Sequence, residues 1–295
     1  MMQYKIKYLI GVDGGGSGTR VVITDTNSNF IAEAQGEPSA LSLGIEKAWQ
    51  SILNTIIAAF DSAKIESPML VECAIGLGLS GVNNTQWKKE FLFRNPGFKI
   101  IEVDTDGYTT LLGAHGGKPG TIVALGTGSI GMILKDNGER QYVSGWGYPS
   151  GDEASGSWLG IRAIRLAEKV LDNRKSPTIL TKKILEKCGN NTDDLLDWLG
   201  NANQNTYATL APIIFSCTEG NDFDQDAVDL LNRAGREVEM MARALDPNLS
   251  APFCICGRLG EALIPFLPSE LKAKNIRPLG DSSRGALLLI KNKIL

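Results

Sequence analysis

Along the chain, short apolar runs typical of strands alternate with longer stretches whose apolar residues have helical spacing. Apolar residues from Ile45 to Phe60 recur at spacings of three and four, which predicts a helix. Shorter helices are expected at 85–93 and 108–114. Between the helices, short apolar runs end at glycine, asparagine or aspartate, and these predict strands at 6–12, 20–24, 30–34, 70–75 and 99–103. Strands alternating with helices indicate an α/β fold.

The opening pattern of strand, glycine turn, strand and polar turn occurs a second time in the middle of the chain. The first copy has its glycine turn at Asp13–Gly18. The second has the turn Gly126–Ser129 between predicted strands at 121–125 and 130–134. No other internal repeat stands out, so the two copies predict two related halves.

A glycine- and proline-containing stretch at 116–120 separates the copies and predicts a domain boundary. We expect domains at 1–115 and 116–283, with a closing helix at 284–295 that can return to the first domain. The second half is more helical, with helices expected from Ser157 to Val170 and at 224–245, and a short strand at 253–256.

Composition narrows the function classes. The 295 residues carry a net charge of −3, so no cationic field exists to attract nucleic acid. There is one histidine, and the five cysteines form no CxxC, which disfavours a thiolate or imidazole metal centre. No apolar run is long enough for a signal peptide or a membrane span. We therefore expect a cytoplasmic protein without nucleic-acid or membrane partners.

Both glycine turns suit phosphate binding. Without Cβ atoms in the way, backbone N–H groups can converge on phosphate oxygens. Asp13 begins the first turn, and a carboxylate beside a phosphate calls for a cation between them, for which Mg²⁺ is the expected ion. Ser17 and Ser129 add hydroxyl groups. The alternative is a pair of tight hairpins without a ligand, but two matched turns favour a nucleotide phosphate site.

A GxGxxG pattern at Gly76, Gly78 and Gly81 supports a second hypothesis. It follows a predicted strand, and Glu102 and Asp104 lie farther along at the end of another strand. This is the pattern of a dinucleotide-binding loop, so a dinucleotide-dependent oxidoreductase is an alternative. However, the expected helix begins several residues past the last glycine, and the two matched turns stay unexplained.

Asp106 and the loop 144–157 are candidates for substrate chemistry. A carboxylate at the end of a strand in an α/β sheet points into the ligand crevice, where it can accept a proton from an attacking sugar hydroxyl. Asp106 could instead cap the next helix. In the loop, Trp146 can cover a sugar face or serve as a packing anchor. Asp152 can bind hydroxyl groups or, like Ser155, cap a helix.

The sequence resembles the N-acetylglucosamine and glucosamine kinases, within the broader group of BadF/BadG/BcrA/BcrD-type ATPase domains. The motifs occur in order over nearly the whole chain. The matching stretches are GVDGGGSGTR at 11–20, GLGLSG at 76–81, DTDGYTTLLGAH at 104–115, ALGTGSIG at 124–131, SGWGYPSGDEASGSWLG at 144–160, CICGRLG at 254–260 and RGALLL at 284–289.

This resemblance implies two actin-like (ribonuclease H-like) domains with a nucleotide cleft between them, and a kinase that uses ATP and Mg²⁺. Asp13 would support the metal and Asp106 would be the base. The residues implied to bind ATP are Gly14, Gly15, Gly16, Ser17, Gly126, Thr127, Gly128, Gly257 and Leu259. Those implied to bind the sugar are Asp106, Ser129, Gly145, Trp146, Gly147 and Asp152.

The expected reaction is in-line phosphoryl transfer from ATP to the 6-hydroxyl of an amino sugar. The choice between glucosamine and N-acetylglucosamine stays open, because Ala40 stands where the family usually has asparagine. The oligomeric state stays open too, a homodimer included. A non-kinase ATPase that drives a partner, as in the reductase activators of the broader group, is the alternative of another class. Those activators carry cysteines for an iron–sulfur cluster.

Overall fold

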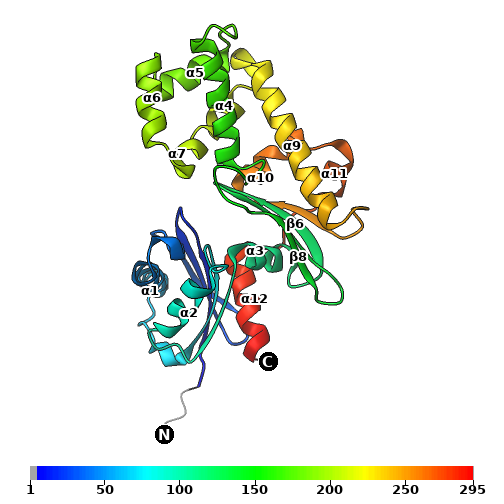
Figure 1. The fold of residues 1–295 in the computed structure, drawn as a ribbon. Helices are drawn as coiled ribbons and strands as arrows, with labels where there is room; N and C mark the ends of the chain where they lie inside the picture. Colours follow the sequence, from blue (N-terminus) through cyan, green and yellow to red (C-terminus); the bar gives the residue numbers. More distant parts are fainter. Residues whose placement is uncertain (1–4, 295) are drawn as a thin grey trace. The chain divides into compact units, whose positions relative to one another are not determined.

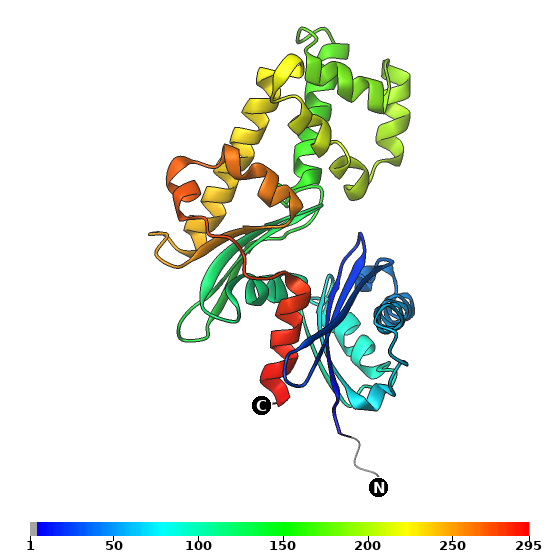
Figure 2. The ribbon, with the colours of Figure 1, turned by 180° about the vertical axis from the view of Figure 1, so that it is seen from behind.

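The computed structural model describes residues 5–294. The chain divides into an N-terminal unit of residues 1–119 and 278–295, and a C-terminal unit of residues 120–277. The closing helix, α12 (Ser282–Ile294), therefore belongs to the same unit as the first strands (Figures 1 and 2). Within residues 5–294, none of the helices combines the length and the apolar character needed to span a bilayer.

The N-terminal unit is built on a five-stranded sheet in the order β3-β2-β1-β4-β5. The antiparallel strands β1, β2 and β3 are followed by β4 and β5, which run parallel to β1. The strand bounds are β1 Tyr8–Gly14, β2 Thr19–Asp25, β3 Phe30–Gly36, β4 Cys73–Leu79 and β5 Ile100–Asp104.

Helices cover both faces of this sheet (Figures 1 and 2). On one face, α1 (Ile45–Ser62) and α2 (Thr85–Phe93) close an apolar core in which Ile52 and Phe60 are fully buried. On the other face lie α3 (Asp106–His115) and α12. The predicted helices at 85–93 and from Ile45 onward are confirmed.

The C-terminal unit repeats the sheet plan with four strands in the order β8-β7-β6-β9. Strands β6, β7 and β8 are antiparallel neighbours, and β9 runs parallel to β6. The strand bounds are β6 Gly120–Leu125, β7 Ser129–Leu134, β8 Arg140–Ser144 and β9 Phe253–Cys256. The repeat expected from sequence is therefore confirmed, since each unit opens with three antiparallel strands and has a glycine turn between the first two.

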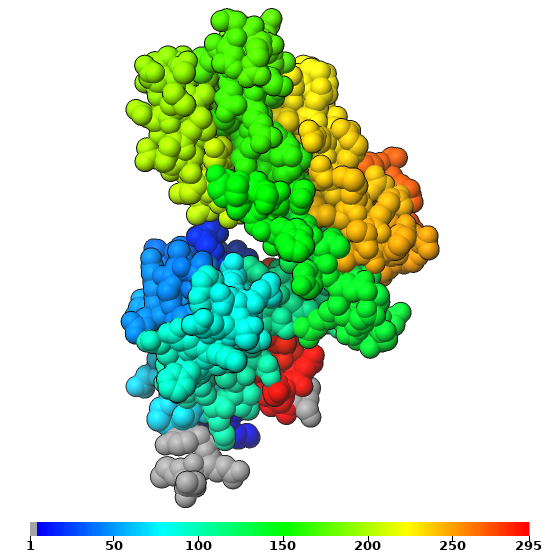
Figure 3. All heavy atoms as spheres, in the orientation of Figure 1, coloured from blue at the N-terminus to red at the C-terminus, as the bar shows by residue number. Residues whose placement is uncertain are grey.

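Helices of the C-terminal unit pack against its sheet and against each other. The long helices α4 and α9 lie side by side, as Figure 3 shows for their outer atoms. The bounds are α4 Gly156–Leu171, α5 Ile179–Cys188, α6 Thr192–Asn201, α7 Gln204–Ala208, α8 Ala211–Ser216, α9 Gln225–Leu245, α10 Arg258–Leu263 and α11 Ser269–Lys274.

Glycines allow α12 and α3 to approach β4 with almost no intervening side chains. A Cβ atom on Gly76 would lie 2.0 Å from the backbone oxygen of Ala286, and one on Gly78 would lie 1.9 Å from Oγ1 of Thr109. Both glycines lie inside β4 and not in a loop after it. The dinucleotide-loop hypothesis is therefore wrong, because these glycines serve packing within the N-terminal unit.

Gly76→Ala is expected to destabilise the protein by about 1–3 kcal/mol, because the new methyl group overpacks a backbone contact that cannot move aside. Urea unfolding measures the change. Gly200→Ala in α6 is the matched control, since a Cβ atom there meets no atom within 4 Å and should leave stability unchanged or raise it. Equal stability of the two variants would contradict this packing role.

Candidate functional site

The first glycine turn joins β1 to β2 and is held by a neighbouring segment. Its Gly15 N–H donates to the carbonyl oxygen of Gly18 over 3.0 Å, and the N–H groups of Ser39 and Ala40 both donate to the oxygen of Gly15. A Cβ atom on Gly14 would lie 2.3 Å from Ser39 Oγ, so packing excludes a side chain there. Around Gly15 and Gly16, however, the space is open.

Asp106 lies at the same end of the sheet as this turn. Strands β1, β4 and β5 are parallel, so the residues that follow their carboxyl ends gather at one edge. Thr105 is the N-cap of α3, because its Oγ1 accepts a hydrogen bond from Tyr108 N–H. The alternative that Asp106 caps this helix is therefore wrong. Its carboxylate accepts local backbone bonds, from Gly107 N–H at 2.9 Å and from its own N–H.

Burial raises the pKa of both Asp13 and Asp106, and nearby negative charge adds to the effect on Asp13. Burial, followed by the charges of Asp106 and Asp281, raises the pKa of Asp13 to about 6, against the opposing effects of a Ser282 hydrogen bond and of Arg20. Burial also raises the pKa of Asp106, against the opposing bond from Gly107 N–H. A nearby cation would relieve both effects. The donor set fits Mg²⁺, which proteins hold through one or two carboxylates together with substrate phosphates.

Asp13→Asn is expected to change how stability depends on pH. The folded protein keeps the Asp13 proton up to about pH 6, whereas an unfolded aspartate loses it near pH 3.8. Wild-type stability should therefore fall as pH rises from about 4 to about 6, by at most about 3 kcal/mol from this group. The variant lacks this loss, so its stability relative to wild type should improve over that interval. Urea unfolding with a chelator tests this, and parallel pH profiles would contradict it.

The second glycine turn joins β6 to β7 and rests on the start of α4. Gly126 N–H donates to the oxygen of Gly128 over 2.9 Å, while the N–H groups of Gly156 and Ser157 donate to the oxygens of Gly126 and Thr127. As at Gly15 and Gly16 in the first turn, a Cβ atom on Gly126 would meet no atom within 4 Å. The start of α4 thus holds the backbone of the turn by hydrogen bonds, while the space around Gly126 stays open.

Other predicted ATP-site residues of the C-terminal unit adjoin this turn. Gly257 follows β9, has φ +85°, and would place a Cβ atom 2.2 Å from the oxygen of Leu125. Only glycine fits there, at the same sheet end as Gly126. Leu259 lies in α10 and packs partly against the core, whereas Arg258 is exposed.

Asp152 connects the second turn to the following loop. It is buried, and its carboxylate accepts hydrogen bonds from Gly147 N–H at 3.3 Å and from Gln204 Nε2 at 2.8 Å. A bond from the N–H of Ser129 reaches the same carboxylate, whose pKa is nevertheless raised by burial. Because these bonds come from the protein, Asp152 positions the turn. Any contact of Asp152 with a sugar stays a prediction.

The remaining predicted sugar-site residues are Ser129, in the second turn, and Gly145, Trp146 and Gly147, in the loop 144–157. The Oγ of Ser129 is buried and has no hydrogen-bond partner among the described residues. This hydroxyl can therefore donate a hydrogen bond to a ligand or accept one from it. Gly145 and Gly147 have positive φ values and shape the loop, in which Ser155 caps α4. The Trp146 side chain is 85% exposed, so it is not a packing anchor.

Sequence reasoning missed several groups around the carboxylates and the second turn. Arg20 Nη1 lies 2.7 Å from Asp281 Oδ2, and Ser282 acts to lower the pKa of Asp13. Gln204 is the other missed residue. In the sequence, Ser282 is marked only by its place just before the closing helix. In the structure, Asp281 Oδ1 accepts a hydrogen bond from Arg284 N–H at the start of that helix.

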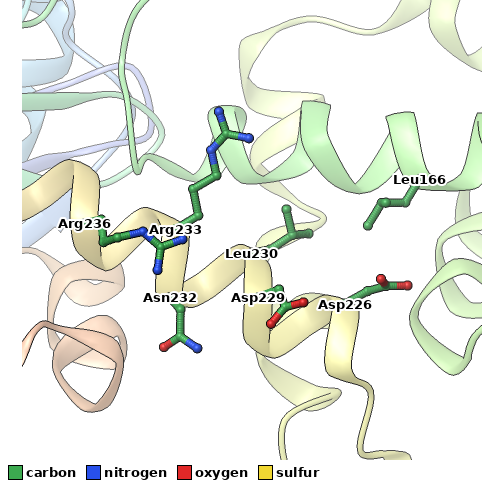
Figure 4. Close-up of a pocket in the computed structure, with 7 residues that line it drawn as sticks. All are labelled: Leu166, Asp226, Asp229, Leu230, Asn232, Arg233 and Arg236. Atoms are coloured by element: carbon green, nitrogen blue, oxygen red, sulfur yellow. The ribbon is translucent and has the colours of Figure 1, made fainter.

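A hollow along α9 is separate from these residues. It is lined by Leu166 of α4 and by α9 side chains that include Asp226, Arg233 and Arg236 (Figure 4). On its other side, Arg233 lies 5.6 Å from the ring of Trp158, which Arg162 also covers. This arginine and tryptophan cluster joins α4 to α9 and includes none of the predicted site residues.

Comparisons with known proteins identify the fold and the family of this chain. The two-unit architecture is the actin-like fold of ATPases and sugar kinases. A ROK-family glucokinase from Streptomyces griseus, solved with glucose and AMPPNP, superposes with a TM-score of 0.56 over 97% of this chain and 99% of its own, and at 16% identity it shows the fold alone. A family profile described as the BadF/BadG/BcrA/BcrD ATPase family matches residues 10–254. The chain belongs to this family.

Three proteins are more similar in sequence. Glucosamine kinase GspK of Vibrio cholerae is 28% identical over 96% of this chain and 95% of its own. An N-acetylmuramic acid/N-acetylglucosamine kinase of Clostridium acetobutylicum is 31% identical over 83% of this chain and 81% of its own. A solved protein from Chromobacterium violaceum, named as a candidate N-acetylglucosamine kinase, is 49% identical with a TM-score of 0.93, and the match covers 97% of this chain and 99% of that one.

Proposed function

We propose that this protein is an ATP- and Mg²⁺-dependent kinase that phosphorylates the 6-hydroxyl of glucosamine or N-acetylglucosamine. The similar proteins are named as kinases of these sugars, which supports the substrate class. The ATPase family supports the use of ATP. The glycine turn of each unit is expected to contact the phosphates of one ATP molecule.

The observation that carries this proposal is the open space around three turn glycines. Gly15, Gly16 and Gly126 lack a positive φ value, and a Cβ atom on any of them would meet no atom within 4 Å. The protein itself therefore gives no steric reason for glycine at these positions. Close approach of a ligand to the backbone supplies such a reason, and N–H groups in a turn are suited to phosphate oxygens.

Asp106 is proposed as the base. Its raised pKa and its freedom from a capping role suit a carboxylate that takes a proton from an attacking hydroxyl. Asp13 would hold the metal ion, whose charge offsets that of the transferring phosphoryl group when it is bound. The buried Ser129 hydroxyl without a partner is proposed to bind the sugar.

The alternative of an ATPase that activates a partner through an iron–sulfur cluster receives little support. Cys254 and Cys256 both lie on strand β9 and are buried inside the C-terminal unit, so neither thiol is exposed at a surface where two subunits could share a cluster. Among the described residues, no three histidine, cysteine, aspartate or glutamate side chains are arranged to hold a metal ion.

A coupled assay of ADP release tests the proposal. The panel contains glucosamine, N-acetylglucosamine, N-acetylmannosamine and glucose, each with ATP and Mg²⁺. We expect sugar-dependent ADP release with one or both of the first two sugars, and a phosphorylated product that is lost when the sugar is blocked at its 6-position. ADP release that no sugar stimulates would contradict the kinase function and favour the ATPase alternative.

A further inference from the structure

The buried carboxylate of Asp152 is held from two sides. Within its own loop it accepts a hydrogen bond from Gly147 N–H at 3.3 Å, and from α7 it accepts one from Gln204 Nε2 at 2.8 Å. A Cβ atom on Gly128 would lie 2.8 Å from Asp152 Oδ2 and 3.3 Å from Gln204 Nε2. The carboxylate and the amide therefore lie together against the backbone of the second glycine turn.

The loop around Asp152 has a backbone conformation that its own residues do not favour. Ser144, Asp152 and Ala154 have φ values of 62°, 58° and 64°, in the left-handed region that residues with a Cβ atom rarely adopt. Such conformations persist where surrounding contacts hold them, and they occur most often at functional sites. Because Asp152 is one of these residues, its hydrogen bond to Gln204 is one of the contacts that hold the loop.

Gln204 is itself held in place by the packing of α7. It is the first residue of this helix, whose N-cap Asn203 accepts a hydrogen bond from a backbone N–H of the first turn. A Cβ atom on Gly160 of α4 would lie 2.1 Å from the backbone oxygen of Tyr207, so α7 lies directly against α4. The Gln204 amide therefore reaches Asp152 from a helix that is anchored independently of the loop.

The hydrogen bond from Gln204 acts on the turn that carries Ser129. An ionised carboxylate only accepts hydrogen bonds, so the amide group of Gln204 donates its N–H to Asp152. Asp152 lies against Gly128, and Ser129 is the next residue in the turn. The buried Ser129 hydroxyl, which has no partner among the described residues, is the group proposed above to bind the sugar. Gln204 is thus connected to that hydroxyl through Asp152.

We propose that Gln204 is a positioning residue for the sugar. It holds the Asp152 carboxylate against the second turn and thereby keeps Ser129 and the loop 144–157 in the conformation that binds substrate. This inference rests on the proposed function. Because Gln204 acts through Asp152, its loss should weaken sugar binding and leave ATP binding intact.

Gln204→Ala is expected to raise the dissociation constant of the sugar by about 10-fold or more, the effect of losing a hydrogen bond to a charged group. The sugar is glucosamine or N-acetylglucosamine, whichever gives the higher turnover. The affinity for a non-hydrolysable ATP analogue and kcat at saturating sugar should both stay within about two-fold of wild type. Asn205→Ala, which changes an exposed neighbour in the same helix, is the matched control and should leave sugar affinity unchanged.

Gln204→Glu distinguishes the hydrogen bond from packing, because it keeps the shape of the side chain. At about pH 8 it places a second carboxylate beside Asp152, and the two like charges should weaken sugar binding. At about pH 5 such a pair can share one proton, which restores a hydrogen bond between the two groups. Sugar affinity relative to wild type should therefore recover as pH is lowered, whereas the deficit of Gln204→Ala should stay constant.

The comparison with wild type at each pH removes the effect of the groups that face this pair. These are Glu153, whose charge acts on Asp152, and the phenols of Tyr148 and Tyr207, whose ring centroids lie 5.8 Å apart between the loop and α7. Both proteins contain all of them. Only the exchanged group at position 204 differs, so a recovery confined to Gln204→Glu reports on its contact with Asp152.

Wild-type sugar affinity in Gln204→Ala, or an equal loss of sugar and ATP affinity, would overturn the positioning role. A Gln204→Glu deficit that is the same at both pH values would overturn it too, and this variant decides the question if Gln204→Ala does not fold. A wild-type protein that neither binds nor phosphorylates an amino sugar contradicts the proposed function and the inference with it. A wild-type kinase with unaltered Gln204 variants removes only the role of Gln204.

Discussion

Replacing Asp106 with asparagine is expected to lower kcat by about 10²–10⁴ with little change in ATP affinity, the usual effect of removing a general base. The amide keeps the volume and the local acceptor for Gly107 N–H but cannot take a proton. Because Thr105 caps α3, the variant should fold as the wild type does. Steady-state kinetics with the preferred sugar, together with thermal unfolding, measure both expectations.

Asp104→Asn is the matched control for this variant. Asp104 ends β5, and its Oδ1 accepts from Thr105 N–H, so it shares the local environment without a proposed role in proton transfer. Its kcat should stay within a few-fold of wild type. The base must be ionised, and burial raises the pKa of Asp106, so kcat should fall as pH is lowered through that pKa. A folded Asp106→Asn protein with unchanged kcat would exclude Asp106 as the base.

Gly126→Val is expected to weaken ATP binding by about 10–100-fold without loss of stability. A Cβ atom at this position meets no protein atom within 4 Å, and Gly126 lacks a positive φ value, so the fold can accept a side chain there. It would, however, occupy the space through which a phosphate reaches the turn. Loss of one charge-assisted hydrogen bond, worth about 1.5–3 kcal/mol, corresponds to this range.

Gly200→Val is the matched control for Gly126→Val. Gly200 is also open around its Cβ position, but it lies in α6 and has no proposed contact with a ligand. Calorimetric titration with the ATP analogue should give wild-type affinity for this protein and reduced affinity for Gly126→Val. Equal affinities in the two proteins would show that the second turn does not bind phosphate.

Much of the fold could be predicted because its signals are local. The strand at 253–256 and the helix at 85–93 were predicted with the bounds that the structure has. The long helix α9 differs by one residue, since Asp224 is its N-cap and not its first residue. The repeat of strand, glycine turn and strand was visible because each turn stands between two β-branched runs.

The four short helices between Thr178 and Ser216 were not predicted. Each has at most ten residues, too few for a clear apolar period. Their signals were the caps Thr178, Asn191 and Asn203, each of which accepts a hydrogen bond from a backbone N–H near its helix start. Such residues are also common in turns, so capping alone does not identify a helix.

Only part of the candidate site could be predicted, because only some of its residues belong to local sequence patterns. Asp13, Asp106 and the turn glycines lie at strand ends or just after them, and strand ends are local features of the sequence. Ser282 and Asp281 act on the pKa of Asp13 only because α12 returns to the first sheet, and no local sequence pattern predicts that placement. Nor does sequence distinguish Gly76, which packs against a backbone, from Gly15, which faces open space.

The account depends on both glycine turns binding the phosphates of one ATP molecule, with Asp106 directed at the acceptor hydroxyl. A crystal structure with a non-hydrolysable ATP analogue, Mg²⁺ and glucosamine tests this most directly. We predict phosphate oxygens within hydrogen-bond distance of N–H groups from both turns, and the sugar 6-hydroxyl next to the Asp106 carboxylate. A triphosphate bound by one turn alone, or a sugar bound away from Asp106, would contradict the account.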